Sequence, residues 1–434
     1  MQKFKEMYKS KLTTPEEAVK VVKSGDKVGV PLGLNDPPAL AAALCKRYQE
    51  LENVRIFQAL GLVPRDYMHK PEYKGHFFYQ SCFHGAGARM GTKTGMSDFD
   101  THHISTVAKT TLKTHHINVF WTAVSPMDAQ GYMTTGLGCV YDREFIEAAD
   151  IVIVEVNENL PRLIGDAKVH ITEVDYVVEH NSPLLQAPGI IPDEKEKTMG
   201  QIIADMVEDE STIQLGIGGI PNAVGMDLFE KRDLGVHTEM FADCMVDLYE
   251  AGVITNRKKT FMRGAMTGCF AMGTDKLYKF LDNNRGTYFL RGAVSNDEMN
   301  IGRNRKMISI NTAISVDMAG QVCAESIGTV QYSGVGGGHE FPRGTRRSDG
   351  GKSIIALHST AKDDTISTIV PVLAPGSVVS VPRVDVQYIV TEYGVAYLEG
   401  KTRSDRARAL IAIAHPKFRA ELEEEAYRLG ILFK

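Results

Sequence analysis

The sequence lacks the patterns that mark zinc ribbons, dithiol redox sites and membrane-spanning helices. The six cysteines are far apart, at positions 45, 82, 139, 244, 269 and 323, and no two of them form a CxxC pair. Cysteines spread through a large chain fit a reducing cytoplasm. No apolar run reaches the roughly eighteen residues that a membrane helix needs, and the polar start MQKFKEMYKSKLTTPEEA contains no apolar signal segment. We therefore expect a cytoplasmic protein with no membrane contact.

The charge pattern and the histidines argue against further classes. The formal net charge is −5 and the lysines and arginines are scattered, so the sequence predicts no nucleic-acid partner. The pairs His102–His103 and His115–His116 look like metal ligands, but adjacent residues on a strand point to opposite faces. Neither an HExxH motif nor a GxSxG motif is present. We expect no metal ion and no serine nucleophile.

The length and the order of the predicted elements indicate two domains. A chain of 434 residues, 43% of them apolar and 24% charged, is an ordinary globular protein that is too long for one average core. Residues 12–60 and residues 196–244 share the order helix, acidic turn, strand, Gly/Pro turn, helix, strand. This repetition predicts an α/β protein with two similar open α/β domains and mostly parallel sheets. The segment 180–200, rich in Pro and Gly, places the boundary and gives domains 1–190 and 191–434.

One carboxylate interrupts a predicted buried strand in the second half. Glu239 lies within GVHTEMFADC, residues 235–244, where Val236, Met240 and Phe241 flank it. The alternative to a functional role is a surface carboxylate on an exposed strand end. A glutamate at the carboxyl end of a parallel strand, however, faces the crevice in which open α/β sheets bind ligands. Desolvation there raises its pKa, and hydrogen bonds to the carboxylate lower it. Such a carboxylate acts either as a base or as a covalent nucleophile, and the residues alone favour neither.

Two glycine-rich segments of the second half are candidate ligand loops. In QLGIGGIPNAVGMDL a strand leads through a turn to a helix start, whose backbone N–H groups can hold a phosphate or an oxyanion. Pro221 excludes the GxGxxG fingerprint there, and no GK[ST] follows. In SGVGGGHEFPRGTRRSDGGKSIIAL, residues 333–357, four glycines precede three arginines and Lys352, which suits a ligand with phosphates. The alternatives are tight backbone packing for the first segment and a solvated surface loop for the second.

Many motifs in order resemble one enzyme family. They are VSPMDAQGYMTTG (124–136), EVNENLPRLIGDAKVHITEVDYVVE (155–179), LGIGGIPNAV (215–224), HTEMFADCMVDLYEAGVIT (237–255), INTAISVDMAGQV (310–322), SGVGGGHEF (333–341), GGKSIIAL (350–357) and TEYGVAYLEGKTRSDRARALIAIAHPKFR (391–419). Together they extend over nearly the whole chain. On these motifs the sequence resembles the acetyl-CoA hydrolase/transferase family, with the greatest likeness to its 4-hydroxybutyrate and butyryl-CoA:acetate CoA-transferases.

The resemblance implies a CoA-transferase fold, with the active site between two similar domains, and a ping-pong mechanism. Glu239 is then the nucleophile, which forms an acyl anhydride and afterwards a glutamyl-CoA thioester. The implied substrates are a short-chain acyl-CoA (butyryl-, acetyl- or 4-hydroxybutyryl-CoA) and a carboxylate acceptor such as acetate, so that coenzyme A is a substrate and no cofactor is permanently bound. Gly334 is the implied backbone donor to the oxyanion, and Asn296 is the residue implied to hold the glutamate. A homodimer is the implied assembly.

The resemblance also implies which residues border the bound CoA or substrate. They are Gly216, Gly218, Gly219, Ile220, Pro221, Gly336, Gly337, Gly338, Glu340, Phe341, Arg343 and Lys352. One stretch departs from the family pattern: GGGHEFPRG has Glu340 where an Asp is usual, and Pro342, which removes a backbone donor and fixes φ. Two alternatives share the same residues. One is an acyl-CoA hydrolase in which water resolves the glutamyl intermediate, and the other is a CoA-binding protein without catalysis.

Overall fold

The structure, a computed structural model, describes residues 2–433, and the chain divides into two compact units. Unit 1 consists of the residues up to Ala187 together with Thr267–Ser295, and unit 2 consists of Pro188–Met266 together with the residues from Asn296 onward. The change of unit after Ala187 falls inside the Pro- and Gly-rich segment 180–200. The sequence pattern indicates a single boundary between two domains. It contains nothing that predicts the return of Thr267–Ser295 to unit 1.

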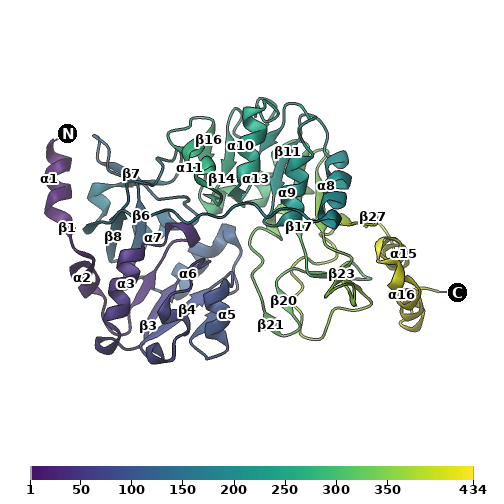
Figure 1. Ribbon diagram of the computed structural model, residues 1–434, viewed down its shortest axis with the longest axis horizontal. Coiled ribbons are helices and arrows are strands. Elements are labelled where there is room, and N and C mark those ends of the chain that lie inside the picture. The colour runs from purple at the N-terminus through teal and green to yellow at the C-terminus, as the bar shows by residue number, and fades with distance from the viewer. Residues whose placement is uncertain (1, 434) are drawn as a thin grey trace. The chain divides into compact units, whose positions relative to one another are not determined.

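Unit 1 is built on an eight-stranded sheet in which every neighbouring pair is parallel (Figure 1). The strand order is β1-β10-β8-β6-β2-β3-β4-β5. The strands are β1 (Leu12–Thr13), β2 (Lys27–Gly29), β3 (Val54–Phe57), β4 (Phe77–Ser81), β5 (Ser97–Phe99), β6 (Val119–Val124), β8 (Ile151–Val156) and β10 (Tyr176–Glu179). Because the chain runs outward from β2 in one direction and from β6 in the other, the sheet is open and doubly wound.

Unit 1 also contains short helices, and the starts of two of them follow local chemistry. The helices are α1 (Gln2–Lys11), α2 (Pro15–Ala18), α3 (Pro38–Lys46), α4 (Asp66–His69), α5 (Ala86–Thr92), α6 (Val107–Thr114), α7 (Asp142–Ala148), α11 (Asp275–Leu281) and α12 (Gly292–Ser295). Thr14 caps α2, because its Oγ1 accepts the N–H of Glu17 at 3.2 Å. At the start of α3, the buried carboxylate of Glu155 accepts the N–H of Leu40 at 2.9 Å, which compensates the positive end of that helix.

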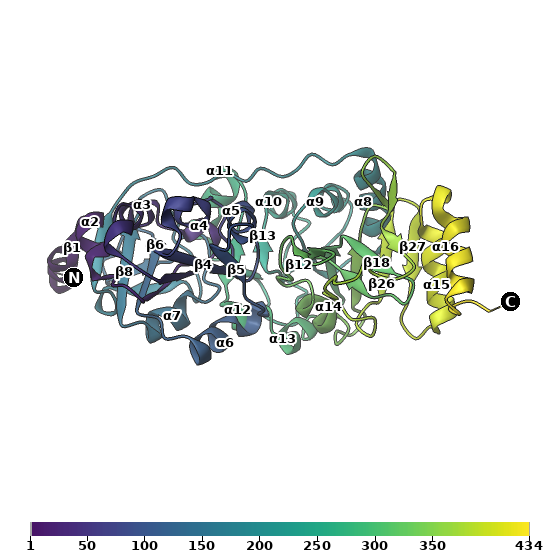
Figure 2. The same ribbon diagram turned by 90° about the horizontal axis from the view of Figure 1, so that it is seen from below.

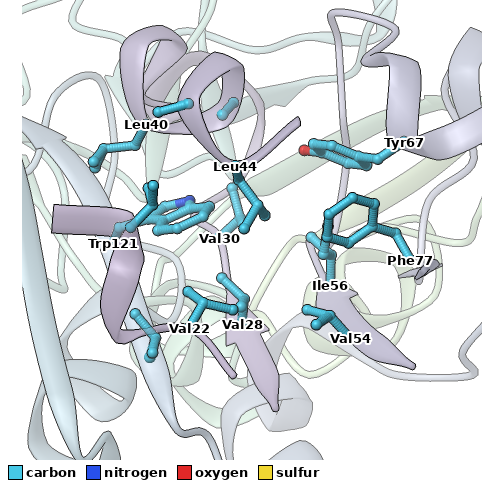
Figure 3. Close-up of a cluster of buried hydrophobic side chains, with 14 of the residues drawn as sticks. Val22, Val28, Val30, Leu40, Leu44, Val54, Ile56, Tyr67, Phe77 and Trp121 are labelled. Atoms are coloured by element: carbon cyan, nitrogen blue, oxygen red, sulfur yellow. The ribbon is translucent and has the colours of Figure 1, made fainter. Parts of the chain in front are cut away.

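The core of unit 1 lies where α3 packs on the sheet (Figure 3). Leu40 and Leu44, one turn apart on α3, lie on the same side of the helix as Trp121 of β6. The labelled strand residues Val28 and Val54 continue the cluster, and none of these side chains is measurably exposed. Burying each such side chain contributes about 1.5–3 kcal/mol, so this layer accounts for a large part of the stability of unit 1.

Unit 2 is built on a six-stranded sheet with the order β12-β11-β17-β22-β26-β27. The strands are β11 (Thr212–Leu215), β12 (Gly235–Val236), β17 (Met307–Thr312), β22 (Lys352–Ala356), β26 (Tyr388–Thr391) and β27 (Gly394–Tyr397). All neighbours are parallel except β26 and β27, which are antiparallel. The chain passes from β11 out to the edge strand β12 and returns to β17 on the other side of β11, so this sheet is also doubly wound. The predicted fold class, two open α/β parts with mostly parallel sheets, is confirmed.

The helices of unit 2 begin with α8, whose start is closed by a capping box. The Asp193 side chain accepts the N–H of Glu196 at 2.8 Å, and Glu196 accepts the N–H of Asp193 at 2.9 Å. The helices are α8 (Glu194–Met206), α9 (Gly219–Met226), α10 (Asp243–Glu250), α13 (Glu298–Gly302), α14 (Glu340–Thr345), α15 (Arg403–Ile413) and α16 (Pro416–Arg428). The last two pack against each other at the carboxyl-terminal end of the chain (Figure 2).

Neither a membrane-crossing helix nor a cluster of metal ligands is present within residues 2–433. No helix in that range is both long enough and apolar enough to cross a membrane. Within the same range, no three His, Cys, Asp or Glu side chains are grouped so that they could hold a metal ion.

Candidate active site

Glu239 lies in a break of the predicted strand. Residues 235–244 form β12, the two-residue strand β13 (Met240–Phe241) and the start of α10, and Glu239 is on the bend between the two strands. The hydroxyl of Thr238 donates to the carbonyl of Met240 at 3.1 Å and closes this bend. His237 and Thr238 are fully buried, whereas Glu239 keeps partial exposure. The prediction of one continuous strand is wrong, because a carboxylate inside the sheet would be desolvated without hydrogen bonds.

A side-chain amide and a backbone N–H hold the Glu239 carboxylate. Asn296 Nδ2 donates to Glu239 Oε2 at 2.7 Å, and the backbone N–H of Gly337 donates to the same carboxylate. Asn296 is fully buried in the short turn before α13, and Gly337 lies in the turn before α14. A Cβ placed on Gly337 would lie 2.4 Å from Glu239 Oε2. The carboxylate therefore reaches the backbone only because position 337 has no side chain.

Opposing effects set the ionisation of Glu239. Burial raises its pKa from 4.5 to about 7, while the hydrogen bonds from Asn296 and Gly337 hold the rise in check. The group is therefore largely ionised a little above neutral pH, yet its charge is poorly solvated. A carboxylate in this state is more reactive toward an electrophilic carbonyl than one in open water.

A second carboxylate shares the amide of Asn296. Glu340, the first residue of α14, is 3% exposed, and Asn296 Nδ2 donates to its Oε2 at 3.2 Å. Because both carboxylates accept from the same nitrogen, the amide is oriented with Nδ2 facing Glu239. Pro342 is the third residue of α14, and the first-turn N–H groups of a helix have no acceptor inside it. The departure GGGHEFPRG thus removes no hydrogen bond from within α14.

The predicted turn of residues 216–221 leads from β11 into α9. Gly218, with φ +130°, precedes the first residue of α9, a conformation that favours glycine. A Cβ on Gly219 would lie 2.2 Å from the carboxylate oxygens of Glu196. The first turn of α9 is therefore in contact with a carboxylate of the chain itself. Ile220 and Pro221 are buried. Since β11 and β12 are parallel neighbours, this turn and Glu239 follow strand ends at the same edge of the sheet.

The structure separates Lys352 from this edge. Lys352 is the first residue of β22, and its Nζ donates to the carbonyl of Met206 and to Glu208, both at 2.9 Å. β12 and β22 run in the same direction. Glu239 follows the carboxyl end of β12, whereas Lys352 is at the amino end of β22, so the two residues lie on opposite sides of the sheet along the strand direction. The structure therefore does not bring Lys352 together with Glu239, although the sequence groups it with the ligand loops. The cause is α14, which carries the chain from the glycine turn back to the beginning of the next strand.

Arg343 stays on α14, near the glycine turn, but it has an internal partner. Its Nη1 lies 3.1 Å from Glu298 Oε1, and 40% of the side chain is exposed. The guanidinium therefore retains accessible surface with which it can meet a ligand. A charge that is already paired attracts an anionic ligand less strongly than an isolated one, since the pair presents little net charge.

The remaining glycines form a compact turn. Gly334 and Gly336 are buried, and the N–H of Gly338 donates to the carbonyl of Val335 at 2.8 Å. Phe341 is fully buried, and its ring centroid lies 6.1 Å from that of His237. This part of the segment is packed, unlike a solvated surface loop. The N–H that reaches Glu239 belongs to Gly337, and the role of Gly334 stays a prediction.

Two residues outside every predicted motif hold the strand before Glu239. Asn256 Oδ1 accepts the N–H of Val236 at 3.0 Å, and Lys259 Nζ donates to the carbonyl of Val236 at 2.7 Å. Lys259 is 2% exposed. In the polar run TNRKKT nothing distinguishes it from Lys258, whose side chain is 43% exposed. Only the folded structure reveals that one of these two lysines is internal.

Comparison with known proteins assigns the family. The acetyl-CoA hydrolase/transferase N-terminal domain matches residues 1–186, and the acetyl-CoA hydrolase/transferase C-terminal domain matches residues 273–426. The succinyl-CoA:cyclohexane-1-carboxylate CoA transferase of Geobacter metallireducens is 42% identical over 98% of this chain and 97% of that protein. The chain belongs to the acetyl-CoA hydrolase/transferase family. The resemblance inferred from the motifs is thereby confirmed.

Other members of the acetyl-CoA hydrolase/transferase family are similar along the whole length. The 4-hydroxybutyrate coenzyme A transferase of Clostridium kluyveri is 40% identical over 97% of this chain and 98% of that protein. Among solved structures, RipA from Yersinia pestis has a TM-score of 0.94 and 34% identity, covering 99% of this chain and 100% of that one. The 4-hydroxybutyrate CoA-transferase of Porphyromonas gingivalis has a TM-score of 0.82 and 32% identity, covering 98% and 100%. The chain is accordingly an enzyme of this family.

Proposed function

We propose that this chain moves coenzyme A from a short-chain acyl-CoA, of the butyryl, acetyl or 4-hydroxybutyryl kind, to a small carboxylate such as acetate. The observation that carries the proposal is the environment of the Glu239 carboxylate. Asn296 Nδ2 donates to it at 2.7 Å, and burial raises its pKa to about 7. This carboxylate is largely ionised a little above neutral pH, weakly solvated and still partly exposed. Those three properties suit attack on a thioester. The proposal includes the homodimer and the cytoplasmic location expected from the sequence.

The first half of the reaction loads CoA onto Glu239. A carboxylate oxygen of Glu239 attacks the thioester carbonyl, the C–S bond breaks, and CoA leaves as a thiolate, which gives an acyl-glutamyl anhydride. The thiolate then attacks the glutamyl carbonyl of this anhydride. The acyl group departs as a carboxylate that carries one oxygen from Glu239, and a glutamyl-CoA thioester remains.

The second half repeats these steps with the acceptor. The acceptor carboxylate attacks the glutamyl thioester and expels the CoA thiolate, which then attacks the acceptor carbonyl of the new anhydride. The acceptor leaves as its CoA thioester, and Glu239 is regenerated with one oxygen from the acceptor. Neither water nor a net proton enters the cycle, so the site must keep water away from the anhydride.

Fixed donors suit the charges that these steps develop. The donors on Glu239, from Asn296 and Gly337, remain within reach of its oxygen in the thioester state, and they need not reorganise. Gly334 is proposed as the backbone donor to the oxyanion on the attacked acyl carbonyl. The turn of residues 216–221 and the segment from Gly336 to Arg343 are proposed to border the CoA. The acyl chain length is proposed from the relatives, whose names specify 4-hydroxybutyrate, butyryl-CoA and acetate.

The covalent intermediate provides the direct test. The protein is incubated with butyryl-CoA and no acceptor, reduced with borohydride and digested, and the peptide that contains Glu239 is weighed. A glutamyl-CoA thioester is reduced to an alcohol, so a defined mass loss at Glu239 is expected, and it is absent in Glu239→Gln. A panel of acyl-CoAs without any modification of Glu239 would overturn the proposal. Binding of acyl-CoA without turnover would then identify a non-catalytic CoA-binding protein.

Isotopic oxygen separates transfer from hydrolysis. In water labelled with ¹⁸O, the transfer cycle places no label in the released carboxylate during a single turnover, because the new oxygen comes from Glu239. Hydrolysis of the glutamyl intermediate would instead bring the label into Glu239 and then into the product. Label-free butyrate, together with a requirement for acetate in steady state, is the expected result. Labelled butyrate at a rate independent of acetate would identify an acyl-CoA hydrolase.

A further inference from the structure

Side chains close the sheet edge that leads to Glu239. β12 is the edge strand of the six-stranded sheet, and the N–H groups of Gly235 and His237 donate inward to the β11 segment at 2.9 and 3.2 Å. Between them, Val236 turns its N–H and carbonyl outward, beside Leu234, whose outward N–H and carbonyl pair with the segment 253–256. Asn256 Oδ1 accepts that N–H at 3.0 Å and Lys259 Nζ donates to that carbonyl at 2.7 Å. These two side chains therefore take the place of a neighbouring strand.

Lys259 is built into this edge. Its Nζ also donates to the carbonyl of Ala265 at 2.8 Å. The aliphatic part of the side chain lies across β12 at Gly235, where an added Cβ would be 2.3 Å from Lys259 Cγ. Burial lowers the pKa of Lys259 to about 7, but a neutral amine keeps two N–H groups, enough for both carbonyls. The bond to Val236 therefore persists in either charge state.

Val236, which Asn256 and Lys259 hold, lies three residues before Glu239. His237 and Thr238, which separate it from Glu239, are fully buried and have no room to absorb a displacement of the strand. We propose that Lys259 is a positioning residue, which fixes the end of β12 through the carbonyl of Val236 and so aims the Glu239 carboxylate at the thioester. The inference rests on the proposed function of Glu239. Lys259 acts only through the strand and touches no substrate.

Lys259→Met is the first test, because it keeps the length and the apolar part of the side chain and removes the donors. The rate of thioester formation at Glu239 is measured with butyryl-CoA by borohydride reduction and mass analysis. We expect this rate to fall roughly 10- to 100-fold at saturating butyryl-CoA, since a displacement of about 1 Å has that effect on a reacting group. The half-saturating concentration should change less than about twofold, because ground-state binding is not involved.

Two further variants distinguish positioning from general destabilisation. Lys259→Gln retains an N–H₂ donor and should restore part of the rate. Lys11→Met is the matched control in unit 1, where Lys11 Nζ donates to the carbonyl of Ile171 at 2.9 Å and to that of Val174. It removes the same kind of bonds and should leave the rate of thioester formation unchanged. Unfolding temperatures of all variants are recorded alongside.

Hydrogen exchange supplies a readout that is independent of catalysis. The peptide that contains Val236 and Glu239 should exchange faster in Lys259→Met than in the wild type, and it should be unaffected in Lys11→Met. A folded Lys259→Met with wild-type labelling and wild-type exchange would overturn the inference, and so would equal losses in both lysine variants. If the wild-type chain itself acquires no label at Glu239, the proposed function fails, and the exchange data alone then decide whether Lys259 holds the strand.

Discussion

Asn296 Nδ2 donates a 2.7 Å hydrogen bond to Glu239 Oε2, between residues that are 57 positions apart in the sequence. The bond favours the ionised carboxylate and so opposes burial, which raises the pKa of Glu239 to about 7. Without the amide of Asn296, the ionised Glu239 carboxylate would lose its side-chain hydrogen-bond donor but would still be desolvated, so its pKa would rise further. Asn296 therefore raises the ionised fraction of the Glu239 carboxylate near neutral pH.

Replacing Asn296 by Ala should move the acidic limb of the pH profile upward. A hydrogen bond to a charged group contributes about 1.5–3 kcal/mol, so its loss should raise the pKa of Glu239 by about one unit or more. Thioester formation at Glu239 is measured with butyryl-CoA across neutral pH. Asn304→Ala is the control, since Asn304 is as buried as Asn296 but donates to the carbonyls of Asn300 and Ile301. An unchanged acidic limb in Asn296→Ala would contradict the assigned role of the amide.

Gly337→Ala should disable the site and also disturb the packing of the buried Phe341, whose Cδ2 would lie 2.9 Å from the added Cβ. The added Cβ would lie 2.4 Å from Glu239 Oε2 and 3.0 Å from Asn296 Nδ2, so the carboxylate and its donor must both move. We expect thioester formation to fall by about 10² or more, because the reacting group is displaced. The labelling rate and the unfolding temperature are measured on the same sample. Wild-type labelling in a folded Gly337→Ala would show that the carboxylate works in a different orientation.

Glu239→Gln should stabilise the protein above neutral pH. The pKa of Glu239 is raised from 4.5 to about 7 in the folded state, so the folded state binds its proton more tightly than the unfolded one. That contribution is fully present below about pH 4.5 and is lost as the pH rises through 7. Removing the charge should therefore add up to about 3 kcal/mol to the free energy of unfolding at pH 8, and little at pH 4.5.

Chemical denaturation of both proteins at the two pH values checks this expectation. Other buried carboxylates with raised pKa values, such as Glu155 and Asp142 of unit 1, titrate equally in both proteins and cancel in the difference. A variant that is equally or less stable than the wild type at pH 8 would argue against a strained carboxylate at this position.

Lys352→Ala should leave the KM for acyl-CoA unchanged, because Lys352 lies at the opposite edge of the sheet from Glu239. Its ion pair with Glu208 is largely solvated, so the free energy of unfolding should fall by less than about 1 kcal/mol. Arg343→Ala is the matched comparison, and it should raise the KM, since Arg343 is accessible on α14 beside the glycine turn. Steady-state kinetics with butyryl-CoA and acetate measure both. An equal rise of KM in the two variants would contradict the placement of Lys352.

The sequence predicts much of the fold, because the elements that it reveals depend on local chemistry. Thr14 and Pro15 start a helix as expected, and the alternation of strands and helices predicts the parallel sheets. The return of Thr267–Ser295 to unit 1 is not predictable in this way, since it depends on contacts between residues distant in sequence. The break of the strand at Glu239 is missed for a related reason. A pattern of apolar residues indicates burial, but it does not show where the strand must end so that a carboxylate can reach hydrogen-bond donors.

The candidate site is predicted in part. Glu239 is singled out as a carboxylate within a predicted buried strand, Asn296 is found through the resemblance to a family, and the structure brings the two together. The donor at Gly337 cannot be separated from its neighbours by composition alone, because four glycines within five positions are equally permissive. The place of Lys352 at the start of β22 depends on the course of the chain, which the sequence motif does not show. Lys259 has no signal at all, because a buried lysine differs from an exposed one in its surroundings and not in its sequence.

The closing of β12 by Asn256 and Lys259 also bears on self-association. An edge strand with unpaired N–H and carbonyl groups is a template on which a strand of another molecule can add. At Val236 both groups are already occupied, so an incoming strand would have to displace two side chains, one of them internal. Loss of Lys259 would thus expose, within the segment that bears Glu239, a place where copies of the chain can pair and aggregate.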